Sequence, residues 1–118
     1  VINRLNESNV PFTYFELAPL DQLQQMYGSC DLYVVGSRHE GGPQSILEAS
    51  AMKVPIISTD VGIASAVLAP NCVFDVSSKM YTPTEEDVNE CFERVQAFEL
   101  KSYTEKYIDL FRKVVESP

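Results

Sequence analysis

A buried strand that leads through a glycine turn into a helix is the feature that most constrains this fold. The apolar run Asp31–Gly36 is followed by Gly41-Gly42-Pro43, and small, apolar residues then predict a helix over Pro43–Met52. Glycine before a helix and proline at its first position favour a helix start here. Strands that are apolar throughout are typical of parallel sheets, whose two faces are covered by helices. The segment therefore predicts one strand–helix unit of an open parallel sheet.

The rest of the chain repeats the alternation of strands and helices. Aromatic and β-branched runs predict strands at Pro11–Leu17, Val54–Ser58 and Cys72–Val76. Apolar residues at helical spacing predict further helices over Leu20–Gly28, Ile63–Leu68, about 83–98 and 101–116. This order predicts an α/β fold with a Rossmann-like, doubly wound parallel sheet of about four strands and flanking helices.

The two C-terminal helices carry apolar stripes that we interpret as core. Thr82-Pro83-Thr84-Glu85 predicts a capping-box start for the first of them. The stripes are Val88, Cys91, Phe92, Val95 and Phe98 in the first helix, and Tyr103, Tyr107, Leu110, Phe111 and Val114 in the second. The 118 residues suffice for one domain and not for two. Residues 1–9 resemble the end of a helix, so one partial domain over residues 1–118 is expected.

Charge and cysteine content exclude several classes of function. A formal charge of −8 argues against binding to nucleic acid or to an anionic membrane, since both require a basic patch. No apolar run approaches the roughly 20 residues of a membrane-spanning helix. The three widely spaced cysteines indicate reduced core thiols in a cytoplasmic protein. With His39 as the single histidine, a metal cluster or a serine–histidine triad is poorly supported.

Glu40 and Glu48 lie on either side of the predicted helix start and suggest a binding site. The N–H groups of Gln44, Ser45 and Ile46 would point out of the first helical turn, where they attract an anion. The two carboxylates can accept hydrogen bonds from hydroxyls but would repel a phosphate. Together these features suggest a nucleotide joined to a sugar. A capped turn without any ligand is the alternative reading of the same residues.

These residues resemble the C-terminal, donor-binding domain of GT-B glycosyltransferases, specifically the retaining group 1, family 4-like enzymes. The signature of that family is a Glu-x7-Glu element, here Glu40 to Glu48. Similar flanking segments are found at residues 27–37 and 48–62, and the resemblance extends from about Pro11 to the last helix. Departures include Lys53, where a glycine commonly ends the helix, and Glu16, which replaces another glycine.

The resemblance implies a role for each matching residue. Glu40 would be the catalytic-site residue that positions the donor hexose near its anomeric carbon, and Glu48 would bind the ribose hydroxyls. Leu17 and Ala18 would lie near the nucleobase. The diphosphate would be held by the turn and the helix start, namely Gly41, Gly42, Pro43, Gln44 and Ser45. No metal and no cofactor is implied beyond the nucleotide-sugar donor.

The implied activity is hexosyl transfer with retention to an acceptor glycan or lipid, which an N-terminal domain absent from this chain would bind. We expect the isolated 118 residues to be inactive. A cytoplasmic location, or one peripheral to the inner membrane face, is expected. A non-catalytic nucleotide- or phosphate-binding module and a GT-B-type nucleotide-sugar epimerase stay open as alternatives. We expect the Asp31–Gly36 strand to pair with Pro11–Leu17, or the fragment to form a homodimer across that edge.

Overall fold

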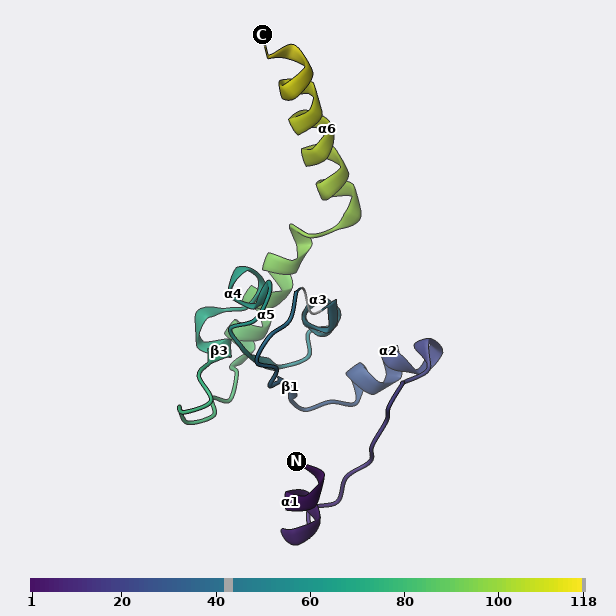
Figure 1. Ribbon diagram of the computed structural model, residues 1–118, viewed down its shortest axis with the longest axis vertical. Helices are drawn as coiled ribbons and strands as arrows, with labels where there is room; N and C mark the ends of the chain where they lie inside the picture. The colour runs from purple at the N-terminus through teal and green to yellow at the C-terminus, as the bar shows by residue number, and fades with distance from the viewer. Residues whose placement is uncertain (42–43, 118) are drawn as a thin grey trace.

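The computed structural model describes residues 1–41 and 44–117 and contains a parallel sheet at its centre (Figure 1). Its strands are β1 (Tyr33–Val35), β2 (Ile56–Thr59) and β3 (Val73–Phe74), in the order β1-β2-β3. Ser58 in β2 is in register with Val35 on one side and with Val73 on the other. The predicted α/β, Rossmann-like class with a parallel sheet is confirmed.

Helices connect and flank the strands, close to the predicted positions. The predicted helix over Pro43–Met52 is found at Gln44–Ala51, whereas its expected N-cap Gly42 and first residue Pro43 lie outside the described residues. The described helices are α1 (Ile2–Glu7), α2 (Leu20–Gly28), α3 (Gln44–Ala51), α4 (Ala64–Val67), the 3-10 helix η1 (Pro70–Cys72), α5 (Glu85–Gln96) and α6 (Leu100–Glu116).

The core is centred on β2, whose residues Ile56, Ile57 and Ser58 are almost completely buried. Helices α3, α4 and α5 pack against one another beside the sheet. Ile46 and Cys91 are fully enclosed between them. A strand that is apolar on both faces is thus covered on both, as a parallel sheet requires. In the apolar stripe of α5, Cys91 and Val95 are core residues and Phe98 packs against the core, as predicted, whereas Val88 and Phe92 are half-buried.

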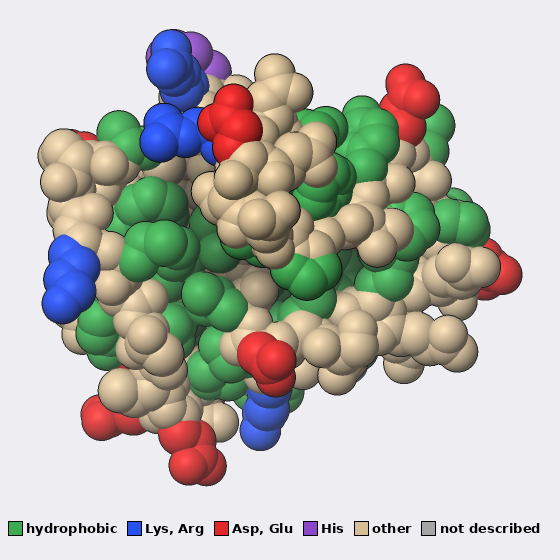
Figure 2. All heavy atoms as spheres, turned by 90° about the horizontal axis from the view of Figure 1, so that it is seen from below, with side chains coloured by type: hydrophobic (Ala, Val, Ile, Leu, Met, Phe, Trp, Pro, Cys, Tyr) green, Lys and Arg blue, Asp and Glu red, His purple; other side chains and the backbone are tan. Residues whose placement is uncertain are grey.

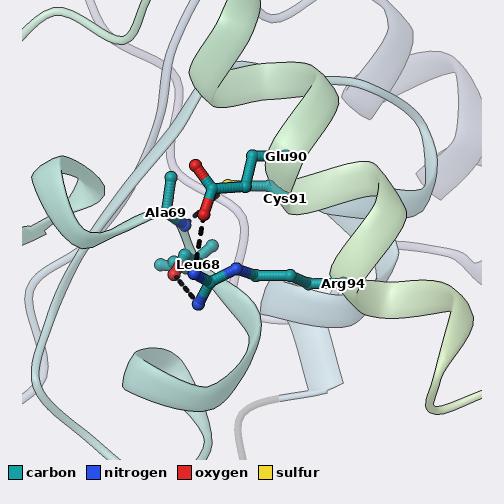
Figure 3. Close-up of polar contacts among 5 residues, drawn as sticks. All are labelled: Leu68, Ala69, Glu90, Cys91 and Arg94. Carbon is teal, nitrogen blue, oxygen red and sulfur yellow. Dashed lines mark hydrogen bonds and ion pairs between the residues drawn. The ribbon is translucent and has the colours of Figure 1, made fainter.

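Polar contacts connect helix α5 to the end of α4 (Figure 3). The Arg94 guanidinium donates a hydrogen bond to the Leu68 carbonyl at 3.0 Å, and it forms an ion pair with Glu90 at 2.6 Å. The Ala69 N–H donates to the Cys91 sulfur at 3.2 Å. These bonds satisfy backbone groups where α4 ends, which would otherwise be buried without a partner.

The capping box of α5 begins two residues later than predicted. Thr84 is the N-cap, and its hydroxyl accepts a hydrogen bond from the Asp87 N–H at 3.2 Å. The Asp87 carboxylate accepts the Thr84 N–H at 2.8 Å and the Tyr81 hydroxyl at 2.6 Å. Pro83 therefore precedes the N-cap. Of the two Thr-x-x-acid patterns at this helix start, Thr82 to Glu85 and Thr84 to Asp87, the one whose acid also accepts a hydrogen bond from Tyr81 forms the capping box.

Lys53 follows α3 with a φ of 55°. This left-handed conformation favours glycine, so Lys53 adopts it at some cost in backbone strain. The Lys53 ammonium lies 4.7 Å from the centre of the Phe92 ring. That cation–π contact with α5 offsets part of the backbone strain.

The predicted strand over Pro11–Leu17 is wrong. The segment runs from α1 to α2 without strand pairing (Figure 1). Its aromatic side chains Tyr14 and Phe15 are 67% and 53% exposed. The sheet has three strands among the described residues instead of about four, and the expected pairing with β1 does not form. Strand propensity reflects packing on a pleated, half-buried surface, and this segment does not reach one.

Figure 2 shows hydrophobic side chains over much of the face seen from below, with charged side chains mainly around its edge.

Helix α6 projects from the body instead of covering it (Figure 1). Phe111 and Val114 are 64% and 65% exposed, so the interpretation of this stripe as core is wrong; the side chain of Tyr103 lies outside the described part. The long axis of the molecule, 65 Å against 34 and 27 Å, reflects this projection. An amphipathic period predicts a helix with one apolar face, but it does not supply the surface that covers that face.

Candidate functional site

Two adjoining cavities of about 380 and 480 Å³ lie where the three strands end. Their walls are formed by the residues at and after the carboxyl ends of β1, β2 and β3. Ligands of open α/β sheets bind at this edge, because the loops after parallel strands meet there. The cavities are lined by residues 37–41, 59–62 and 73–76.

Glu40 lies on the loop after β1, in the wall of the smaller cavity. The Ser37 hydroxyl donates a hydrogen bond to the Glu40 carboxylate. The Ser37 carbonyl in turn accepts the Thr59 hydroxyl at 2.6 Å. A side chain from the end of β2 thus holds the loop after β1. The Glu40 carboxylate is exposed to solvent, so its remaining lone pairs can accept hydrogen bonds from a ligand.

Basic and acidic residues line the two adjoining cavities. Arg38 and His39 share the cavity walls with Asp60, and Asp75 lies in the larger cavity. Hydrogen bonds from the N–H and the hydroxyl of Ser77 lower the pKa of Asp75, which keeps that carboxylate ionised. Donors and acceptors around one cavity suit a polyhydroxylated ligand. Asp60 and Asp75 were not expected in the site, although each follows a strand as Glu40 does.

The residues expected at the diphosphate are placed in part. Gly41 lines the smaller cavity, and among the described residues no atom beyond its chain neighbours lies within 4 Å of where a Cβ would be, so this side of the backbone is open to a ligand. Gln44 is exposed and Ser45 half-buried at the start of α3; Gly42 and Pro43 lie outside the described residues. The first N–H groups of a helix have no acceptor within it. The fully buried Ile46 fixes this helix start against the core.

Glu48 is half-buried on α3, and its carboxylate accepts a hydrogen bond from the Tyr27 hydroxyl at 2.8 Å. Burial, and then the Glu48 carboxylate, raise the pKa of Tyr27, so the phenol stays protonated and donates. Glu48 lines a cavity of about 390 Å³ beside α2 and another of about 340 Å³ beside α5. Tyr27 was not expected in the site, because nothing in the local sequence relates it to Glu48.

Leu17 and Ala18, the residues expected near the nucleobase, lie before α2. Leu17 is 89% exposed and Ala18 is half-buried. Neither lines the cavities beside Glu48. The structure therefore brings the two glutamates and the start of α3 to adjoining elements, and leaves Leu17 on the surface.

Metal ligands and membrane spans were searched over the same described residues. No group of three or more His, Cys, Asp or Glu side chains there could hold a metal ion. None of the helices in this part of the chain combines the length and the hydropathy needed to span a membrane. Cys30, Cys72 and Cys91 are free thiols.

Comparison with known proteins identifies the family. A Bacillus subtilis (strain 168) protein, named as a teichuronic acid biosynthesis glycosyltransferase, TuaC, is 41% identical over 49 residues, which are 42% of this chain and 13% of that protein. The match thus covers a small part of the relative's length. No solved structure matches at a comparable level of significance. The family of glycosyl transferases group 1 matches residues 2–97, most of the chain, and the chain therefore belongs to this family.

Proposed function

We propose that this chain supplies the donor-binding site of a retaining glycosyltransferase, which moves a hexose from a nucleotide sugar to an acceptor glycan or lipid. One observation carries the proposal: Glu40 lies at the edge of the sheet where ligands bind, just before α3, and Glu48 lies on α3 just after the start of that helix. Family membership supports glycosyl transfer. The name of the B. subtilis relative is consistent with a glycan acceptor.

Each part of the donor has a chemically suited group in this arrangement. The hexose would lie in the smaller cavity, where Glu40 accepts hydrogen bonds from its hydroxyls. The diphosphate would lie against the first N–H groups of α3, and Glu48 would accept the ribose hydroxyls. Leu17 and Ala18 would approach the base. A helix start stabilises the negative charge that grows on a departing nucleoside diphosphate, so the transfer is proposed to be metal-independent.

Substitution of Glu40 tests the proposal in the full-length protein. Glu40→Ala should lower turnover by about 100-fold or more with a smaller change in donor affinity, because it misplaces the reacting carbon. Release of nucleoside diphosphate from a panel of nucleotide sugars measures turnover, calorimetry measures donor affinity, and NMR of the product reports its anomeric configuration. The control is Glu93→Ala, at an exposed position of α5. Equal turnover with and without Glu40 would refute its role.

A further inference from the structure

We infer that Tyr27 is a positioning residue that holds the Glu48 carboxylate in the orientation that receives the donor ribose. The inference rests on the proposed function of Glu48 and adds a residue of α2 to that site. The observation behind it is a hydrogen bond between side chains 21 positions apart, from the Tyr27 hydroxyl to Glu48 Oε2 at 2.8 Å.

Tyr27 is itself rigidly placed. Its ring is only 8% exposed, in the last turn of α2, and it meets the Tyr33 ring of β1 edge-to-face at 5.5 Å between centroids. Glu48, in contrast, is half-buried and ends in a carboxylate that can rotate. Because the donor is fixed and the acceptor is mobile, the hydrogen bond orients Glu48 and not Tyr27. The sheet orients Tyr27, and Tyr27 in turn orients Glu48.

The hydrogen bond leaves Glu48 able to bind a diol. An ionised carboxylate has about four lone-pair sites on its two oxygens. Tyr27 occupies a site on Oε2, so Oε1 and the rest of Oε2 remain for two vicinal hydroxyls. The cavity of about 390 Å³ between α2 and α3, which both residues line, gives space on this side of Glu48. A ribose offers such a pair of hydroxyls, and a 2′-deoxyribose does not.

Removing the Tyr27 hydroxyl should therefore impair recognition of the ribose specifically. A freed carboxylate must be ordered when the nucleotide binds, and ordering one flexible side chain corresponds to roughly a three- to tenfold loss of affinity. A 2′-deoxynucleotide, which uses the carboxylate less, should lose little. The signature is a fall in the ratio of ribo to 2′-deoxy affinity.

The experiment is calorimetry on the full-length protein with UDP, GDP, ADP and their 2′-deoxy counterparts. The variants are Tyr27→Phe, Glu48→Gln and both together. Tyr81→Phe is the matched control, since it also removes a tyrosine–carboxylate hydrogen bond, of 2.6 Å to Asp87 at the start of α5. The affinity ratio is measured on one preparation, so a reduced folded fraction cancels. Tyr27→Phe keeps the buried ring and its contact with Tyr33, so it removes only the hydroxyl.

The inference predicts that Tyr27→Phe lowers the ratio roughly three- to tenfold and that Tyr81→Phe leaves it unchanged. Beside Glu48→Gln, where the charge that Tyr27 orients is gone, Tyr27→Phe should have a smaller effect. If Glu48→Gln lowers the ratio and Tyr27→Phe does not, the inference is wrong while the proposed ribose role stands. An equal loss of ribo and deoxy affinity with Tyr27→Phe would show a structural role only. If neither variant changes the ratio, the ribose role of Glu48 fails and the inference fails with it.

Discussion

Glu48 is an acidic residue on an otherwise small and apolar helix, and we predict that its charge strengthens binding of the donor nucleotide. Glu48→Gln keeps the shape and the acceptor for Tyr27 but removes the charge, and hydrogen bonds to charged groups are the stronger ones. In the full-length protein it should weaken binding of the donor nucleotide by roughly 1–3 kcal/mol. Calorimetry with nucleoside diphosphates measures this. Glu93→Gln, at an exposed position of α5, is the control, and an unchanged affinity for Glu48→Gln would contradict the prediction.

Glu48 also shows which features of the site can be predicted from the sequence and which cannot. The spacing of Glu40 and Glu48 around a helix start could be read from the chain, because strand, turn and helix are local features. The residues that hold these two glutamates in place could not be predicted from the sequence. Tyr27 reaches Glu48 across 21 positions, and Thr59 reaches the Ser37 carbonyl across 22. Such contacts depend on how α2 and β2 pack against their neighbours, which no local pattern specifies.

At the scale of elements, the start of α5 depends on the ionised Asp87. Hydrogen bonds, first from the Tyr81 hydroxyl and then from Thr84, lower the pKa of this carboxyl in the folded chain. Its contribution to stability is therefore complete above the unfolded pKa, about 3.9. The contribution is lost as the pH falls through the lower, folded pKa.

Asp87→Asn should consequently reduce the free energy of unfolding at pH 7, by roughly 0.5–2 kcal/mol as for other lost helix caps. The difference from the wild type should shrink as the pH falls below about 4, where the wild-type carboxyl also becomes protonated. Urea unfolding at several pH values measures it. Glu86→Gln, an exposed acid in the same helical turn, serves as control. A difference that stays constant down to pH 2 would argue against the ionised carboxylate.

Elements defined by local signals were predicted well, and those that need a partner were not. Helices α2, α3 and α5 have apolar spacing and start or stop residues, and they form within a few residues of the predicted bounds. The Pro11–Leu17 segment has the aromatic content of a strand, but a strand exists only where another edge accepts its hydrogen bonds. In the same way, the stripe of α6 predicts the helix and says nothing about what covers it.

At the scale of the whole molecule, β1 forms one edge of the sheet. The Tyr33 N–H donates to the Pro55 carbonyl at 2.8 Å, so Tyr33 and Val35 direct their backbone groups toward β2. In a parallel ladder the alternate residue, Val34, then directs its N–H and carbonyl away from the sheet. Among the described residues no strand pairs with this edge. An unpaired edge is a template for pairing with another chain.

We therefore predict that the 118-residue chain associates with itself through β1. Val34→Pro should make it monomeric, because proline removes the outward donor yet is tolerated on an edge strand. Val34→Thr keeps that donor and should still associate. Light scattering over a concentration series distinguishes these results. Phe111→Ser, on the exposed face of α6, identifies the other candidate surface. If Phe111→Ser abolishes association and Val34→Pro does not, the chains meet through α6. A wild-type chain that stays monomeric at every concentration would show that the free edge of β1 is not used for association.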